Sequence, residues 1–330
     1  MAMTAIPPSA RLWQLATGHF LPRCLHVVAE LGVADYLGDT PATAEALAAA
    51  AGANADALER MLRLLAVAGI FEARATLWTH TELSRLLRSD HPQSMRPFVR
   101  MIGGRMQWTA AGELEYAGRT GEAAIEKLVS GGLWAYFRDH PEEARIFDAA
   151  MTGKAVAEIR ALLPAFDFSR YGVIADVGGG RGHVLRAVLD AAPGAQGVLF
   201  DQPSVVGALA PSARMTFRGG DFFKDPLPEA DAYLLSNVLH DWADREAERI
   251  LRAVRRSAPR HAEVLVLESP LPEGGEAHHA KVLDIVMLAL TGGRERTQRE
   301  YQALFEAAGF RLDRVVATAG PFSVIVGVPA

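Results

Sequence analysis

A cluster of glycines directly after a short apolar run constrains this chain more than any other feature. Residues 173–177 read Val-Ile-Ala-Asp-Val, which has the length and composition of a buried strand. Gly178 to Gly180 and Gly182 follow, and apolar residues then recur at helical spacing over residues 184–189. A strand, a glycine turn and a helix in this order predict the first crossover of a doubly wound α/β sheet, because glycine lets the backbone turn sharply and lie against a ligand.

The spacing of the glycines indicates which class of ligand such a turn can bind. A dinucleotide-binding turn needs G-x-G-x-x-G, but the third glycine would fall on His183 or Leu185 when counted from Gly178 or Gly180. A phosphate-binding loop ends in Gly-Lys-Ser/Thr, which does not close this turn. What remains is Asp176 followed by alternating glycines, a pattern that resembles motif I of S-adenosylmethionine-dependent methyltransferases. A glycine loop that only packs the helix on the strand is the alternative.

Composition and charge limit the class of protein. The chain has 330 residues, half of them hydrophobic, which is enough for two ordinary domains. Its net charge of −5 argues against nucleic acid or an anionic membrane as the main partner. Cys24 is the only cysteine, so no internal disulfide forms and a reducing compartment is expected. Because residues 1–10 lack a basic signal-peptide start and no apolar run reaches a membrane span of ~20 residues, we expect a cytoplasmic protein with no membrane contact.

The first 95 residues predict a small helical domain. Apolar residues recur at three and four positions from Leu12 to Leu37, with a break or new start at Pro22. Thr40 and Pro41 predict the N-cap and first position of a second helix, and residues 55–68 predict a third. Short apolar segments within residues 70–79 predict a hairpin, so the order is that of a winged helix.

A winged helix raises the question of DNA binding. The third helix offers only Arg60 and Arg63 against Glu59, and its other faces are apolar. DNA binding needs a basic surface that neutralises phosphates. We therefore expect residues 1–95 to bury their apolar faces against a second copy of the chain, giving a homodimer that does not bind nucleic acid.

Residues 96–155 predict a helical connector that is rich in aromatic residues and methionines. Most of these side chains are expected in the core. Large flat side chains next to a catalytic domain can also line a pocket for an aromatic acceptor. We expect Trp108 and Phe147 to contact the acceptor and Met151 to contact the cofactor.

Acidic residues follow the next predicted strands of the sheet. Asp201 ends the second strand, where it can bind a ribose diol or cap the following helix. Asp221 follows the third strand, where it can accept a hydrogen bond from a nucleobase amine. We expect further residues of these loops at the same crevice: Gly220, Phe222 (packing on the face of the base), Ser236 and Asn237.

Five motifs occur in a fixed order: Asp176-Val-Gly-Gly-Gly, Phe200-Asp-Gln-Pro, Gly220-Asp-Phe-Phe, Asn237-Val-Leu-His-Asp-Trp and Gly292-Gly-Arg-Glu-Arg-Thr. Over nearly the whole chain they resemble the family of caffeate-type plant, acetylserotonin-type animal and bacterial natural-product O-methyltransferases. The resemblance implies an α/β fold with a Rossmann-like class I methyltransferase domain at residues 156–330 and an N-terminal winged-helix-like dimerisation domain. It also implies S-adenosylmethionine as donor, S-adenosylhomocysteine as product and the histidine of His-Asp-Trp, His240, as general base. Asn237 departs from the Arg of many relatives, and residues 130–134 match no pattern.

The reaction explains why a histidine is needed. A phenol with a pKa of about 10 is mostly protonated at neutral pH, so a base must remove its proton as the oxygen attacks. His240 follows the fourth strand, and Glu268 and Glu295 fall at the same edge, where one or both can orient its imidazole. Asp241 either contacts the acceptor or caps the next helix. No acidic cluster indicates a divalent site, so we expect no metal.

Four other functions compete with O-methylation of a small aromatic metabolite. A relative of the same fold can methylate nitrogen, or use the cofactor without methyl transfer. A winged-helix regulator that senses the cofactor predicts a basic reading helix, which the sequence lacks. A nicotinamide oxidoreductase predicts G-x-G-x-x-G, which fails.

Overall fold

The computed structural model describes residues 6–207, 209–210 and 212–330, and the chain divides into two compact units. The first unit holds the described residues up to Trp108 together with His140–Gly153. The second holds Thr109–Asp139 and Lys154–Ala330. The domain boundaries expected at residues 95 and 155 stay predictions.

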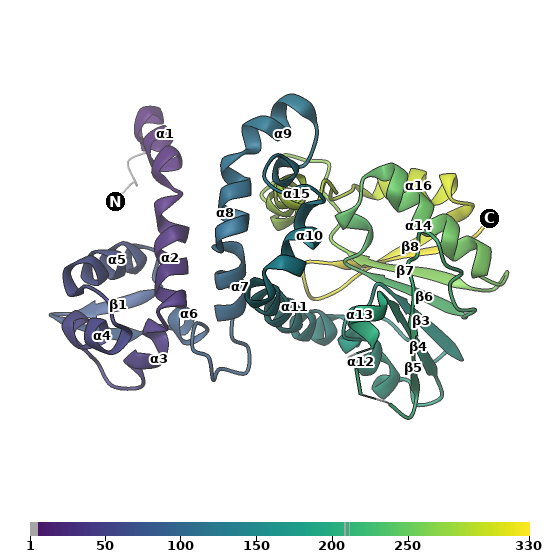
Figure 1. The fold of residues 1–330 in the computed structure, drawn as a ribbon, viewed down its shortest axis with the longest axis horizontal. Coiled ribbons are helices and arrows are strands. Elements are labelled where there is room, and N and C mark those ends of the chain that lie inside the picture. Colours follow the sequence, from purple (N-terminus) through teal and green to yellow (C-terminus); the bar gives the residue numbers. More distant parts are fainter. Residues whose placement is uncertain (1–5, 208, 211) are drawn as a thin grey trace. The chain divides into compact units, whose positions relative to one another are not determined.

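The second unit is built on a seven-stranded sheet with the order β5-β4-β3-β6-β7-β9-β8 (Figure 1). The five strands from β3 to β7 are parallel, and β9 pairs antiparallel with both β7 and β8. The chain order reverses between β3 and β6, which is where ligands bind in such sheets. β3 has the bounds predicted for the first strand, and β4 ends at Asp201 as predicted. The strands are β3 Val173–Val177, β4 Gln196–Asp201, β5 Met215–Gly219, β6 Ala232–Ser236, β7 Glu263–Glu268, β8 Phe310–Ala317 and β9 Ser323–Pro329.

Helices cover both faces of this sheet (Figure 1). Successive side chains of a strand point to opposite faces, so Ala175 and Val177 of β3 pack with α14 and α16, whereas Ile174 packs with α12 and α13. Thr297 and Glu300 have capping-box spacing in the sequence, and they form this box at the start of α16. The helices and turns of this part are α9 Leu114–Thr120, η1 Ala124–Lys127, α10 Gly132–Asp139, α12 His183–Ala191, α13 Pro203–Val206, η2 Leu239–Asp241, α14 Asp244–Ser257, α15 His279–Leu290 and α16 Gln298–Ala307. Helix α11 Pro141–Leu162 belongs to the first unit up to Gly153 and to the second from Lys154.

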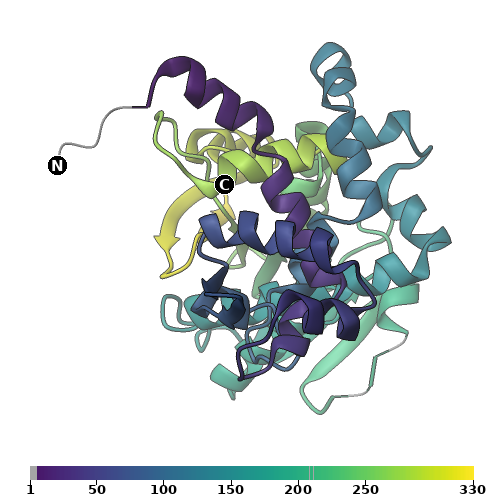
Figure 2. The same ribbon diagram turned by 90° about the vertical axis from the view of Figure 1, so that its left-hand side faces the viewer.

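The first unit is helical with one hairpin, drawn in purple and blue in Figures 1 and 2. Its core is formed by side chains such as Val28, Leu47, Leu62 and Phe71. The elements are α1 Pro8–Thr17, α2 Phe20–Glu30, α3 Val33–Leu37, α4 Ala44–Ala51, α5 Ala55–Val67, β1 Phe71–Arg74, β2 Leu77–His80, α6 Glu82–Arg85, α7 Arg96–Ile102 and α8 Arg105–Gly112, the last of which continues into the second unit. The predicted third helix and hairpin are confirmed.

Two details of the predicted N-terminal helices differ from the structure. The segment from Leu12 to Leu37 forms three helices, and Pro22 lies in the first turn of α2, where a missing N–H costs nothing. The N-cap prediction for Thr40 was wrong, because α4 starts at Ala44 with Thr43 as its cap. Ala42 pairs with Trp78 of β2 as a β-bridge, and this long-range pairing keeps the segment before Thr43 out of the helix.

Helix α1 buries none of its residues within the chain, although it carries Leu12, Trp13 and Leu15. These side chains are 60–69% exposed, so they form an apolar surface that nothing in the described part of the chain covers. Among the described residues, no helix combines the length and the apolar character that crossing a bilayer requires.

Candidate active site

The glycine turn after β3 has the backbone that only glycine adopts readily. Gly178, Gly180 and Gly182 have φ values of 73°, 57° and 70°. A Cβ on Gly178 would lie 3.0 Å from Val238, whereas a Cβ on Gly180 would meet nothing within 4 Å. The turn is therefore packed on one side and open at Gly180.

Asp176 is buried at the end of β3 without a hydrogen-bond partner. It is 1% exposed, and neither carboxylate oxygen is paired with any described residue. Burial and then the charge of Asp201 raise the pKa of Asp176 to about 7, and the Leu185 N–H, although it lies outside hydrogen-bond geometry, offsets part of this rise. Because buried polar groups are nearly always paired, this carboxyl fits a ligand that brings a donor or a positive charge.

Asp201 ties the end of β4 to the glycine turn. Its carboxylate accepts hydrogen bonds from the Gly180 N–H at 2.7 Å and from the Gln202 N–H at 2.6 Å. The N-cap of α13 is Gln202 and has no side-chain cap, so Asp201 does not cap that helix. Each oxygen keeps a lone pair, as binding of a ribose diol requires.

The loop after β5 carries the next residues that were predicted to bind the cofactor. Asp221 accepts from the Phe223 N–H at 2.9 Å and pairs with Lys224. The ring of Phe222 stands edge-on to those of Phe223 and Trp242, with centroids 4.7 and 5.9 Å away. A Cβ on Gly220 would lie 2.6 Å from the Phe200 ring, so close packing requires this glycine. The roles of Gly220, Asp221 and Phe222 in cofactor binding stay predictions.

Asn237 is held by helix α11. Its φ of 54° lies in the left-handed region, which asparagine tolerates better than most residues. Its Oδ1 accepts from Lys154 Nζ at 2.5 Å, and its Nδ2 donates to Glu158 at 3.1 Å and to Ser236 Oγ at 3.3 Å. The side-chain amide is thus engaged within the protein, and the predicted cofactor contacts of Ser236 and Asn237 remain to be tested.

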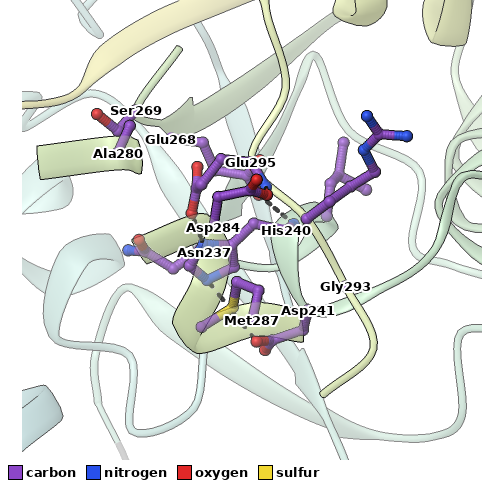
Figure 3. Close-up of polar contacts among 12 residues, drawn as sticks. Asn237, His240, Asp241, Glu268, Ser269, Ala280, Asp284, Met287, Gly293 and Glu295 are labelled. Carbon is purple, nitrogen blue, oxygen red and sulfur yellow. Dashed lines mark hydrogen bonds and ion pairs between the residues drawn. The ribbon is translucent and has the colours of Figure 1, made fainter. Parts of the chain in front are cut away.

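His240 lies buried in the turn η2, and Figure 3 shows its side chain and that of Glu295 pointing toward each other. Its Nδ1 is 2.7 Å from Glu295 Oε1, and its Nε2 is 3.8 Å from Asp241 Oδ1. Burial by itself lowers the pKa of His240. The Glu295 hydrogen bond and the charges of Asp241, Glu268 and Glu295 outweigh burial and raise the pKa to about 9.

The two glutamates act on different parts of His240. Glu268 Oε1 accepts from the His240 backbone N–H at 3.0 Å, and its Oε2 accepts from the Tyr301 hydroxyl. Glu295 contacts the imidazole, and its own N–H donates to Asp284 at 2.9 Å. Hence Glu295 contacts the ring, and Glu268 contacts the backbone that carries it.

Asp241 is partly buried beside the imidazole. Burial raises the pKa of Asp241 to about 6, and the charge of His240 partly opposes this rise. The N-cap of α14 is Ala243, so Asp241 does not cap that helix.

Glu295→Gln is expected to change stability in a pH-dependent way. The pKa of His240 is raised in the folded state, so its pairing stabilises the protein fully below about pH 6.5 and this contribution is lost as the pH rises through about 9. The difference in free energy of unfolding between wild type and Glu295→Gln should therefore shrink over this range. Urea denaturation at several pH values measures it. Glu273→Gln, an exposed control, should show a small constant difference, and a constant difference for Glu295→Gln would contradict the pairing.

The structure also identifies residues to which the sequence interpretation gave no role. Arg296 belongs to the motif that begins at Gly292, and its side chain is fully buried. Lys154 of α11 and Tyr301 of α16 reach the site from helices. The sequence signal of Lys154 and Tyr301 is weak, because only their contacts distinguish them from ordinary helix residues. Arg296 lies in a loop, and the motif does not show which groups its side chain binds. Trp108, Phe147 and Met151 belong to the first unit, and their roles in binding remain predictions.

Comparison with known proteins identifies the family. A model of an O-methyltransferase domain matches residues 113–311, and a model of the O-methyltransferase dimerisation domain matches residues 13–90. The chain belongs to this O-methyltransferase family. It is an S-adenosylmethionine-dependent enzyme whose methyltransferase domain has the predicted α/β fold.

Relatives of this O-methyltransferase cover almost its full length. Phenazine O-methyltransferase of Lysobacter antibioticus is 41% identical over 98% of this chain and 97% of its own. The S-adenosylhomocysteine-bound structure of a methyltransferase of calicheamicin biosynthesis has a TM-score of 0.88 and 40% identity, covering 99% and 100% of the two chains. An 8-amino-8-demethylriboflavin N,N-dimethyltransferase of Streptomyces davaonensis is 38% identical, covering 91% and 89%.

Proposed function

We propose that this enzyme transfers a methyl group from S-adenosylmethionine to a hydroxyl of a small aromatic metabolite, with His240 as general base. The observation that carries the proposal is the buried pair of His240 Nδ1 and Glu295 Oε1, 2.7 Å apart at the carboxyl edge of the sheet. A base that is oriented by a carboxylate suits proton removal from a weakly acidic hydroxyl.

The residues of the glycine turn fit the cofactor. The unpaired carboxyl of Asp176 can take the ammonium of its methionine part, and Asp201 can take the ribose hydroxyls. Gly180 leaves the backbone open toward the ligand. Since the pKa of Asp176 is raised by burial and by Asp201, a cationic ligand relieves an unfavourable pair of carboxyls.

The tautomer of His240 follows from its partner. An ionised carboxylate only accepts hydrogen bonds, so Nδ1 carries the proton toward Glu295 and Nε2 is left to take a proton from the acceptor. The bound cofactor supplies an electrophilic methyl group on a positively charged sulfur. Alignment of the acceptor oxygen with that methyl group can contribute about 7–11 kcal/mol to catalysis.

His240 must be neutral to act as a base. Its pKa of about 9 keeps it protonated at neutral pH in the ligand-free protein. A positive charge bound nearby lowers the pKa of a histidine. His240 is therefore expected to release its proton when the sulfonium is in place, so that an active base forms only in the loaded site.

Two further features of the proposal follow from the chain and its relatives. The exposed apolar side of α1 and the dimerisation domain support a homodimer. The phenazine-methylating relative supports a polycyclic aromatic acceptor. Methylation of an aromatic amine is the second candidate, because one relative is named as an N,N-dimethyltransferase.

Calorimetric titration with S-adenosylmethionine, S-adenosylhomocysteine and NADH tests the cofactor. We expect saturable binding of the two sulfur compounds and none of NADH, and the opposite result would overturn the proposal. Transfer of a labelled methyl group to paired phenols and anilines, such as 1-hydroxyphenazine and 1-aminophenazine, then tests the acceptor. Methylation of the amine alone would replace O-methylation by the second candidate.

A further inference from the structure

We propose that Arg296 is a positioning residue of the reaction, whose buried guanidinium locks the turn that carries His240 to the loop that carries Glu295. The inference rests on the proposed role of His240. Among the described residues, the Arg296 side chain makes no hydrogen bond to the imidazole or to the Glu295 carboxylate.

The guanidinium of Arg296 binds the two ends of the turn. It is fully buried, with Nη1 donating to the Leu239 carbonyl at 3.0 Å and Nη2 donating to the Trp242 carbonyl at 2.8 Å. Its Nε donates to Asp244 Oδ1 at 2.9 Å, which pairs the buried charge. Each of the three guanidinium nitrogens therefore holds a point within or just after the turn.

The backbone of the same loop binds the middle of the turn. The N–H of Arg294 donates to the His240 carbonyl at 2.9 Å. Glu295 stands between these two anchors, and its carboxylate reaches the imidazole. With residues 294 and 296 both attached to the turn, the distance between Glu295 Oε1 and His240 Nδ1 is set by the loop and does not depend on that single hydrogen bond.

Arginine can make these three contacts at once, whereas lysine cannot. Its planar fork presents several donors at fixed angles, whereas lysine presents a compact charge that cannot reach carbonyls at both ends of a turn. A lysine at this position would keep the charge near Asp244 and leave at least one buried carbonyl unpaired. The turn would then be free to shift against Glu295 while the rest of the fold is retained.

The pair Arg296→Lys and Arg294→Lys tests this role. Arg294 has a nearly half-exposed side chain and pairs with the same Asp244 and with Glu300, so it is a matched control from the same loop. The first readout needs no ligand: the pKa of His240, measured by NMR on isotope-labelled protein and assigned by its loss in His240→Asn. We expect a lower pKa in Arg296→Lys, because Glu295 is held less closely, and the wild-type value in Arg294→Lys.

The second readout is methyl transfer to 1-hydroxyphenazine. We expect kcat to fall about 10–100-fold in Arg296→Lys with little change in cofactor affinity, since misplacement by about 1 Å can cost this much. Asp244→Asn, which weakens one of the three anchors by removing its charge, should shift both readouts in the same direction by less. This second variant also covers the case in which Arg296→Lys does not fold.

The outcomes separate the inference from the proposed function. A wild-type His240 pKa and kcat in Arg296→Lys, together with a slow His240→Asn enzyme, would overturn the role of Arg296 alone. Equal kcat values for wild type and His240→Asn would overturn the proposed base and this inference with it. A fall in kcat that matches the fraction of unfolded Arg296→Lys protein, with an unchanged His240 pKa in the folded fraction, would reduce Arg296 to a stabilising residue.

Discussion

A His240→Asn enzyme is expected to transfer methyl groups to a simple phenol about 10²–10⁴-fold more slowly than the wild type, the usual contribution of a positioned base. The loss should appear in kcat, because asparagine cannot take the proton that leaves the phenol. Affinity for S-adenosylmethionine should not fall, since the proposed cofactor contacts come from Asp176, Asp201 and the glycine turn and residue 240 of the variant has no proton to release on binding. Rates at saturating cofactor and acceptor, together with calorimetric affinities, measure both effects.

The size of this loss should depend on the acidity of the acceptor. A phenol whose pKa lies below the assay pH is already ionised and needs no base, so the ratio of wild-type to His240→Asn rates should shrink with such acceptors. His261→Asn is the control: this exposed histidine pairs with Asp231 before β6, away from the carboxyl edge of the sheet, and should leave the rate unchanged. A ratio that stays the same from weakly to strongly acidic phenols would contradict proton removal by His240.

The features that could be predicted from the sequence are local in the chain. The glycine turn, the parallel strands and the capping box of α16 depend on residues that are neighbours in sequence, so periodicity and spacing are sufficient. The order of the strands then brings Asp176, Asp201 and His240 to one edge of the sheet. This is why most candidate residues of the second unit lie near one another in the structure.

What the sequence could not provide depends on contacts between distant residues. The start of α4 was misplaced because Ala42 pairs with Trp78, 36 positions later. The amide of Asn237 lies between Lys154 and Glu158 of α11, about 80 positions earlier in the chain, so spacing in the sequence does not reveal its partners. Assigning Glu295 to the ring and Glu268 to the backbone likewise required atomic distances.

Gly293→Ala is expected to lower kcat about 10²-fold and to destabilise the fold by about 1–3 kcal/mol, the usual cost of overpacking. A Cβ at this position would lie 1.9 Å from the His240 carbonyl oxygen and 2.4 Å from the Asp241 carbonyl carbon. Both are backbone atoms, so no side chain can move aside. The turn that carries the proposed base must shift instead, and the imidazole moves with it. Urea denaturation and rates at saturating substrates measure the two effects.

Two other glycine-to-alanine variants distinguish this close contact from the general effect of replacing a glycine. A Cβ on Gly275, in the exposed loop before α15, would meet nothing within 4 Å, so Gly275→Ala should leave rate and stability nearly unchanged. Gly292 has a φ of 73°, but a Cβ there would meet only a methyl group at 3.5 Å. Gly292→Ala should therefore cost about 1 kcal/mol of stability through its backbone while disturbing the rate less than Gly293→Ala. If Gly292→Ala and Gly293→Ala lost activity equally, the loss would come from the loop conformation and not from the close approach to His240. A larger loss in Gly293→Ala links catalysis to the contact between this loop and the turn.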